Sequence, residues 1–230
     1  MTSTHKQSLG APPYKDLTIV IQAGGESKRM GTLHAPTKAL VPFLGEPLVV
    51  RIAKRLAYLV NEIVITIQND FLKDFEQAFL HWDKPTKIRF VVDAYHERGA
   101  LPGIYTAFLA SQTAYTALVA CDTPFVAPRL IEEEYHFIQR RSADACIVRT
   151  QDFFYEPMQA VYATKPCFQA VSHALFSGEK RAASWIPNVH ALYFSNEALS
   201  HIPSHKFAFF NANTPEDILH GEYIARKLSE

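Results

Sequence analysis

The segment covering residues 17–40, LTIVIQAGGESKRMGTLHAPTKAL, limits the fold more than any other part of the chain. It opens with a short apolar run rich in β-branched side chains, which predicts a buried strand over residues 17–23. Gly24 and Gly25 end this run. Glycines at a strand end let backbone N–H groups approach an anion, because no Cβ blocks the way. The segment therefore predicts a strand followed by an anion-binding loop.

Positive side chains accompany this loop at Lys28, Arg29 and Lys38. Backbone donors, a guanidinium group and an ammonium group together suit a triphosphate. The loop is not a Walker A motif, because no Gly-Lys-Ser/Thr follows at the required spacing, and the dinucleotide motif G-x-G-x-x-G is also absent. The alternative is an ordinary turn with solvated lysines, since glycine commonly marks turns.

Length and composition favour a single globular domain. The 230 residues suffice for one well-cored domain and are few for two, and a hydrophobic content of 48% argues against disorder. The formal net charge is zero, so no overall field attracts nucleic acid, and any anion site must be local. We expect no nucleic-acid partner.

The first sixteen residues are polar and lack an apolar core, which predicts a flexible tail over residues 1–16 rather than a signal peptide, and a domain over residues 17–230. No apolar run approaches the ~20 residues that a membrane span needs. The three cysteines are far apart, so neither a disulfide framework nor a zinc site is indicated. These features predict a cytoplasmic protein with no membrane partner.

Apolar strand-like runs alternate with helix-like segments along the chain, which is typical of a mostly parallel sheet covered by helices. An aromatic residue at every fourth position over residues 71–79 predicts a core-facing helix. Thr214 followed by proline and two acids predicts a capped helix start. Strands are predicted at 17–23, 62–68, 88–92, 116–121, 145–149, 159–162 and 189–194; further helices are predicted at 48–60, 101–112, 128–141, 166–176, 181–185 and 215–228.

Three candidate site positions follow predicted strands: the glycine pair Gly24-Gly25, Asp93 and Asp122. Ligands of open parallel sheets bind beyond the carboxyl ends of the strands, so we expect these positions to converge. A carboxylate at the end of a buried strand must be paired, hydrogen-bonded or metal-bound, and Mg²⁺ held together with substrate phosphates would satisfy Asp122. The alternative for Asp122 is a helix N-cap or a turn aspartate before proline.

The opening segment resembles the signature A-G-G-x-S-x-R-M-G with a downstream lysine, found in nucleotidyltransferases. The whole chain is similar to the molybdenum cofactor guanylyltransferase family, over about residues 17–228. The resemblance implies an α/β, Rossmann-like fold, with a mostly parallel sheet and helices on both faces, in a single domain. After the opening signature, the similar segments in chain order are Lys38-Ala39-Leu40, Gly45-Glu46-Pro47-Leu48, Gly99-Ala100-Leu101-Pro102-Gly103-Ile104, Cys121-Asp122-Thr123-Pro124-Phe125, Glu156-Pro157-Met158-Gln159-Ala160-Val161-Tyr162 and Asn211-Ala212-Asn213-Thr214-Pro215-Glu216-Asp217.

This resemblance implies an enzyme that transfers GMP from GTP to the terminal phosphate of molybdenum-bound molybdopterin and releases pyrophosphate. It implies GTP and molybdopterin or the molybdenum cofactor as partners, and a client molybdoenzyme or its chaperone as a further one. Mg²⁺ is the implied cofactor, with Asp122 as its ligand. Arg29, Lys38 and Asp122 are the implied catalytic residues.

By the same resemblance, Asp93 and the segment 99–103 recognise the base. An aspartate can accept hydrogen bonds from both N1–H and the 2-amino group of guanine, which adenine cannot offer; the alternative is a strand-end turn residue. Asn211 and Asn213 face the acceptor, or else only shape a turn. The implied nucleotide-binding residues are Ala23, Gly24, Gly25, Lys38, Asp93, Gly99, Leu101 and Asp122.

The chain departs from the family pattern at two places. Gln22 stands where the family usually has leucine, and residues 32–37 lengthen the connection to Lys38. Two other functions remain open: a related enzyme that uses CTP or another phosphorylated acceptor, and a non-catalytic carrier of nucleotide or molybdopterin. The combination of a predicted metal ligand with predicted phosphate clamps favours the enzyme.

Overall fold

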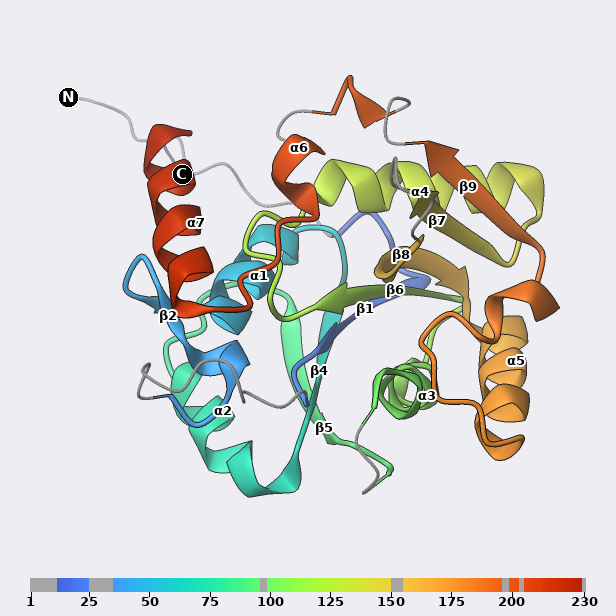
Figure 1. The fold of residues 1–230 in the computed structure, drawn as a ribbon, viewed down its shortest axis with the longest axis horizontal. Coiled ribbons are helices and arrows are strands. Elements are labelled where there is room, and N and C mark those ends of the chain that lie inside the picture. The colour runs from blue at the N-terminus through green and yellow to red at the C-terminus, as the bar shows by residue number, and fades with distance from the viewer. Residues whose placement is uncertain are drawn as a thin grey trace.

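The computed structural model describes residues 12–24, 35–95, 99–149, 155–195, 199–202 and 205–228. Helices and strands alternate through most of this part of the chain (Figure 1). The strands of the main sheet are β1 (Leu17–Gln22), β4 (Glu62–Ile67), β5 (Lys87–Val92), β6 (Tyr115–Ala120), β7 (Ala145–Arg149), β8 (Tyr155–Ala163) and β9 (Ala191–Ser195). The helices are α1 (Leu48–Leu56), α2 (Leu72–Ala78), α3 (Ala100–Ala110), α4 (Pro128–Arg141), α5 (Thr164–Phe176), α6 (His205–Ala208) and α7 (Pro215–Lys227).

Within the described residues the main sheet has seven strands in the order β5-β4-β1-β6-β8-β7-β9. Strands β5, β4, β1 and β6 are parallel neighbours, and so are β7 and β9. Strand β8 runs antiparallel to both β6 and β7, so its first residues lie at the edge where β1 and β6 end. The predicted α/β fold with a mostly parallel sheet is confirmed.

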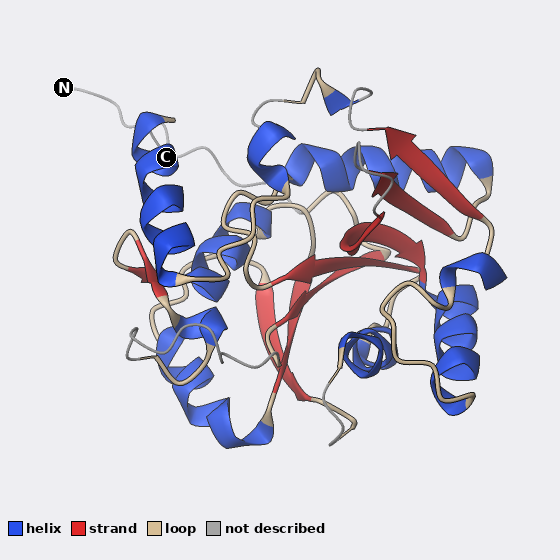
Figure 2. Ribbon diagram, in the orientation of Figure 1, coloured by secondary structure: helices blue, strands red, loops and turns tan. Residues whose placement is uncertain are grey.

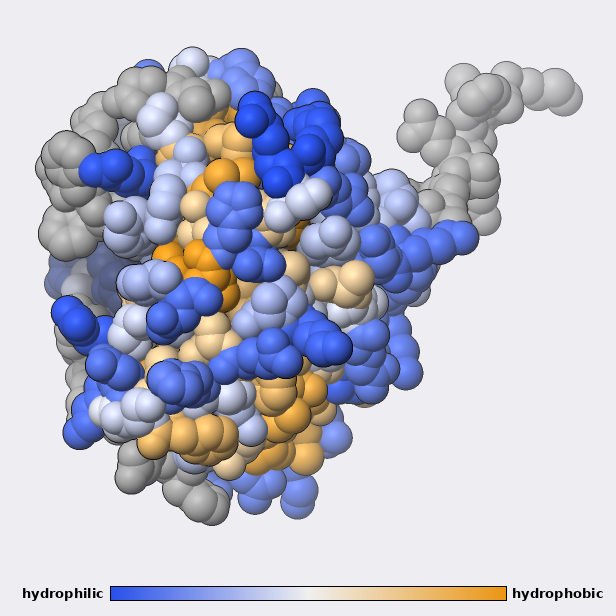
Figure 3. All heavy atoms as spheres, turned by 90° about the vertical axis from the view of Figure 1, so that its right-hand side faces the viewer, coloured by the Kyte–Doolittle hydropathy of each residue, from blue (hydrophilic) through white to orange (hydrophobic). Residues whose placement is uncertain are grey.

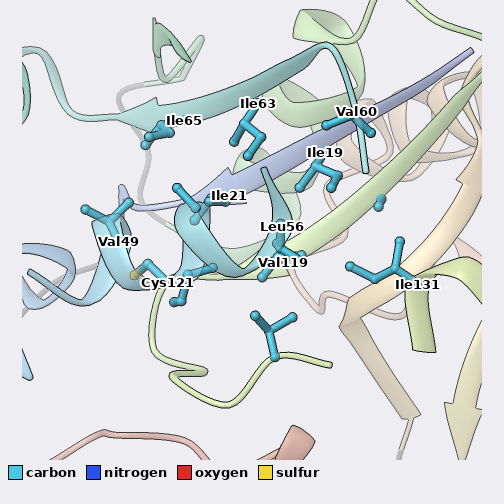
Figure 4. Packing of buried hydrophobic residues seen from close by; sticks show 14 of the residues in the cluster. Ile19, Ile21, Val49, Leu56, Val60, Ile63, Ile65, Val119, Cys121 and Ile131 are labelled. Carbon is cyan, nitrogen blue, oxygen red and sulfur yellow. The ribbon is translucent and has the colours of Figure 1, made fainter. Parts of the chain in front are cut away.

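Helices cover both faces of the sheet (Figure 2), as predicted. Because side chains alternate along a strand, Ile19 and Ile63 face the side of α1 and belong to the same buried cluster as Leu56 (Figure 4). The residues between them, such as Val20 and Val64, face the opposite side, where α3 and α5 pack. Burial on both faces explains why the central strands read as continuous apolar runs.

The aromatic stripe on α2 belongs to the core, as predicted. Phe75 is fully buried and Phe79 nearly so. Both rings pack near Phe90 of β5, with centroids 6.2 and 5.7 Å away, and Phe79 also contacts Trp82. These aromatic side chains attach α2 to the sheet, and their burial in the core explains the aromatic spacing without a ligand.

A small hairpin that was not predicted joins β2 (Pro42–Phe43) to β3 (Glu46–Pro47). Its two turn residues, Leu44 and Gly45, both have positive φ angles, 51° and 79°, as a two-residue type I′ turn requires. The backbone N–H of Leu44 donates to Glu222 of α7 at 2.7 Å, so the hairpin is joined to the last helix.

The start of α7 matches the sequence prediction. The Thr214 hydroxyl accepts from the backbone N–H of Asp217, and the Asp217 carboxylate accepts from the backbone N–H of Thr214 at 2.8 Å. This reciprocal pair is a capping box, which satisfies backbone donors that a helix start would leave unpaired. The Asp217 carboxylate also accepts from the backbone N–H of Asn213, so the cap holds the preceding loop in place.

The prediction of a helix at 181–185 is wrong. These residues form turns and lead into a 3₁₀ turn, η3 (Ile186–Asn188). The fully buried Trp185 ring packs against Phe108 and Tyr162, and its indole N–H donates to the carbonyl of Ala182 at 2.8 Å. Packing of this large ring, rather than local helix propensity, determines the path of the chain here.

Some predicted boundaries also shift. Helix α1 ends at Leu56 rather than at residue 60, and β8 begins at Tyr155, four residues before its predicted start. Tyr14 and Asp16, assigned to the tail from sequence, contact the domain. Tyr14 forms an isolated parallel β-bridge with Val60, just before β4. The Asp16 carboxylate accepts a hydrogen bond from the hydroxyl of Tyr135 at 2.5 Å. The packed part of the chain therefore begins before Leu17.

The surface on the side of α5 and β9 mixes hydrophobic and hydrophilic residues (Figure 3). Leu109 of α3, Phe176 of α5 and Tyr193 of β9 are among the exposed large hydrophobic residues of the described chain. In the described part of the chain, every helix is too short or too polar to cross a membrane.

Replacing Gly221 of α7 by alanine should lower the free energy of unfolding by about 1 kcal/mol. A Cβ there would lie 2.8 Å from a ring carbon of Phe43 and 3.0 Å from one of Phe210. Overpacking of this kind costs about 1–3 kcal/mol, which outweighs the gain of about 1 kcal/mol in helix propensity. Urea denaturation measures the change. The control Leu219→Ala, at a 69% exposed position on the same helix, should stay within about 0.5 kcal/mol of wild type. Stabilisation by Gly221→Ala would contradict the packing argument.

Candidate active site

The carboxyl ends of β1, β4, β5 and β6 border a cavity of about 730 Å³. The start of β8 reaches the same edge because this strand is antiparallel. As predicted from the strand ends, Gly24, Asp93 and Asp122 converge there. The cavity is lined by Gln22, Gly24, Lys38, Thr66, Gln68, Asn69, Asp70, Val92, Asp93, Tyr95, Gly99, Ala100, Pro102, Gly103, Ala120, Cys121, Asp122, Met158 and Asn213.

One end of the cavity holds a cluster of Lys38, Asp122 and Asn213. The Lys38 ammonium donates to Oδ2 of Asp122 and, at 2.5 Å, to Oδ1 of Asn213. The Lys38 and Asp122 side chains are only 13% and 18% exposed. A backbone hydrogen bond of 2.8 Å, from Ala212 N–H to the carbonyl of Asp122, holds the two loops together. The lengthened connection before Lys38 therefore still brings this lysine to the site.

Asp122 retains binding capacity beyond this ion pair. Its second oxygen, Oδ1, is buried and has no hydrogen-bond partner among the described residues. A second carboxylate lies nearby on β8, at Glu156, where burial and the negative charge of Asp122 raise the pKa. The side chain of Asp122 thus pairs with a lysine rather than capping a helix or closing a turn. Carboxylate and amide oxygens are ligands that suit Mg²⁺, so the residues present fit such an ion.

The Asp93 carboxyl group lies against Gly24. A Cβ at Gly24 would come within 2.0 Å of Oδ2 of Asp93, so no residue larger than glycine fits here without displacing the carboxyl. The carbonyl of Gly24 accepts from the side-chain amide of Gln68 at 2.5 Å. Burial raises the pKa of Asp93 to about 6, and its Oδ1 is buried without a partner among the described residues. Asp93 therefore offers an unused polar atom to a ligand.

The structure divides the predicted site residues into three groups. Those that line the cavity are Gly24, Lys38, Asp93, Gly99, Asp122 and Asn213. Gly25 and Arg29 lie outside the described residues.

The third group does not line the cavity: Ala23, Leu101 and Asn211. The Ala23 N–H donates to the Thr66 carbonyl at 2.9 Å in the sheet, and Leu101 is fully buried in the core. Asn211 is exposed, and its side-chain amide donates to the Phe209 carbonyl at 3.2 Å. The two asparagines expected to act together thus have different surroundings.

Sequence reasoning missed several lining residues. Gln68, Asn69 and Asp70 directly follow β4, so the strand-end rule applied to Asp93 and Asp122 could have found them. Met158 lies in one of the segments that resemble the family, but no local pattern assigned it to the site, because its position depends on β8 entering the sheet antiparallel. Gln22 was noted only as a departure from a family pattern, and its side chain lines the cavity.

Comparison with known proteins places the chain in one family. The model of the MobA-like NTP transferase domain matches residues 19–192. A probable molybdenum cofactor guanylyltransferase of Natronomonas pharaonis is 34% identical over 201 residues, which cover 87% of this chain and 94% of that protein. Another protein of this description, from Pelotomaculum thermopropionicum, is 30% identical over 210 residues, covering 90% and 93% of the two chains.

Solved structures share the fold. Molybdopterin-guanine dinucleotide biosynthesis protein A from Archaeoglobus fulgidus superposes with a TM-score of 0.74 at 22% identity, covering 91% of this chain and 99% of that one. A 4-diphosphocytidyl-2C-methyl-D-erythritol synthase from Anaerococcus prevotii gives a TM-score of 0.67 at 13% identity, covering 92% and 99%. The family match over most of the chain, together with two relatives at 30% identity or more, shows that this protein belongs to the MobA-like NTP transferase family.

Proposed function

We propose that this protein transfers GMP from GTP to the terminal phosphate of molybdopterin in the molybdenum cofactor, forming a guanine dinucleotide and pyrophosphate. The observation that carries the proposal is the cluster of Lys38, Asp122 and Asn213 beside a cavity of about 730 Å³. This volume lies in the range of pockets that bind ligands of nucleotide size. The names of the relatives support guanine and molybdopterin as the two halves of the product.

The base end of the nucleotide site lies at Asp93 in this proposal. Its buried and unpartnered oxygen is an acceptor for the N1–H and 2-amino donors of guanine. Gly24 allows the carboxyl to lie directly against the backbone at the end of β1, where a larger residue would displace it. Gly99, directly before α3, lines the same cavity.

The triphosphate end lies at Lys38 and Asp122. The ammonium of Lys38 would neutralise charge on the phosphates, and its present partners hold it beside the metal-binding carboxylate. Mg²⁺ would be held by Asp122, with the amide oxygen of Asn213 within the same cluster. When bound, this ion would stabilise the negative charge on the α-phosphate and the departing pyrophosphate. Arg29 and Gly25, from the loop after β1, are proposed to add donors to the same phosphates.

The reaction needs positioning and charge stabilisation more than covalent participation of the protein. An oxygen of the acceptor phosphate attacks the α-phosphorus of GTP in line with the bond to the β-phosphate. A new P–O–P linkage forms, the α–β bond breaks, and the pyrophosphate leaves with the bonding electrons. Asn211, exposed outside the cavity, is proposed to contact the acceptor. Asn213 is proposed to position the Lys38 ammonium, from which its Oδ1 accepts a hydrogen bond.

The test of this function is turnover with defined substrates. Protein, Mg²⁺, GTP and molybdenum-loaded molybdopterin should yield equal amounts of pyrophosphate and guanine dinucleotide, measured by coupled pyrophosphate assay and by mass spectrometry of the released cofactor. ATP and CTP at the same concentration should be used at least tenfold less well, since a rejected base leaves buried polar groups unpaired. Preference for CTP would indicate the related cytidylyl enzyme. Binding of both substrates without pyrophosphate release would indicate a carrier.

A further inference from the structure

Gln22, the last residue of β1, carries a polar group that the strand does not use. Its backbone lies between Thr66 of β4 and Ala120 of β6, and its side chain lines the cavity. The amide nitrogen Nε2 is buried and has no hydrogen-bond partner among the described residues. A buried N–H donor without an acceptor is costly, and binding of a ligand that accepts from it would remove that cost.

The fold makes room for this side chain at Gly103 of α3. A Cβ at Gly103 would lie 3.3 Å from Oε1 and 3.7 Å from Nε2 of Gln22. These separations are close to contact distance, so the absent side chain at Gly103 leaves just enough space for the carboxamide. The carboxamide is therefore confined between the end of β1 and the first turns of α3.

The unused donor of Gln22 and the unused acceptor of Asp93 border the same cavity. Asp93 touches Gly24, two residues after Gln22 in the chain, and both side chains line the same cavity. Guanine presents an acceptor, O6, beside two donors, N1–H and the 2-amino group. Adenine and cytosine present an amino donor where guanine has O6. A donor from Gln22 combined with an acceptor from Asp93 therefore matches guanine better than either alternative base.

We propose that Gln22 is a base-specificity residue of this chain, whose Nε2 donates a hydrogen bond to O6 of guanine. The inference rests on the proposed function, because it assumes that the base of GTP occupies this end of the cavity. Leucine, which the family usually has at this position, could not donate this hydrogen bond. Recognition of O6 by this side chain would therefore distinguish this chain from family members with leucine.

The experiment compares two nucleotides that differ at one atom. Binding of GTP and of 6-thio-GTP, in which sulfur replaces O6, is measured by calorimetry for wild type and Gln22→Leu. Wild type should bind GTP about tenfold more tightly than the thio analogue, because sulfur is a weaker and larger hydrogen-bond acceptor than oxygen for a buried donor. Gln22→Leu should bind GTP about tenfold more weakly than wild type and no longer distinguish the two. The control Gln77→Leu, at an exposed position on α2, should behave like wild type.

A second variant, Gly103→Ala, displaces the carboxamide without removing it, and alanine is favourable within a helix. It should reduce the preference for GTP over 6-thio-GTP severalfold. If wild type binds GTP but Gln22→Leu and Gly103→Ala keep the wild-type preference for O6, this inference is wrong and the proposed function stands. If wild type binds neither GTP nor its analogue, both the proposed function and this inference are wrong. Circular dichroism establishes that the variants are folded.

Discussion

Replacing Asp122 by asparagine should lower kcat for guanylyl transfer by roughly 10²- to 10³-fold and leave the fold intact. The amide has the same shape as the carboxylate but no negative charge. It would bind Mg²⁺ weakly through its buried Oδ1, and it would no longer pair with the ammonium of Lys38. The negative charge that develops on the α-phosphate during attack by the acceptor would therefore be less well stabilised. Steady-state turnover at saturating GTP, acceptor and Mg²⁺ measures this effect.

The matched control is Asp83→Asn, which makes the same change in net charge at a 69% exposed side chain paired with Lys84. It should retain wild-type turnover, so that a loss in Asp122→Asn is assigned to the site rather than to overall charge. Thermal melting of both variants tests whether they fold. Wild-type turnover of Asp122→Asn at saturating Mg²⁺ would remove Asp122 from the metal site and from the catalytic residues.

Replacing Asp93 by asparagine should reduce the preference for GTP over ATP by at least tenfold. Asparagine exchanges one acceptor oxygen for a donor, which would face the N–H groups of guanine. In the proposed complex the carboxylate would accept from both donors. A hydrogen bond to a charged group is worth about 1.5–3 kcal/mol, so losing it would lower the affinity for GTP at least tenfold. Asp70→Asn is the control, because Asp70 lines the same cavity at an exposed position and the change in charge is identical. Equal losses in both variants would assign the effect to long-range electrostatics.

The same contact predicts a pH dependence with a defined sign. Burial raises the pKa of Asp93 to about 6, so the carboxyl in the free protein is protonated below that pH and loses acceptor capacity. Affinity for GTP should therefore fall as the pH drops below about 6 and level off above it, with proton release on binding in the acidic range. The Asp93→Asn variant should lack this inflection. A wild-type profile that is flat between pH 5 and 7 would contradict a role for this carboxylate.

Local sequence patterns were sufficient to place several residues of the candidate site at one edge of the sheet. An apolar run that ends in glycine or aspartate marks the end of a buried strand, and parallel strands end at one edge of the sheet. This rule predicts that Gly24, Asp93 and Asp122 converge, and all three line one cavity. The start of α7 was equally predictable, because the capping box at Thr214 lies within four consecutive residues.

Contacts between distant segments were decided by the tertiary structure. Asn213 meets Lys38 across 175 positions of sequence, and no local pattern distinguishes it from Asn211, which faces solvent. Leu101 and Gly103 belong to one motif, yet the turn of α3 buries the first in the core and directs the second towards Gln22. Sequence alone determined which strand ends carry polar groups, since that depends on neighbouring residues. Packing of the helices and the reversed direction of β8 determined which of those groups meet.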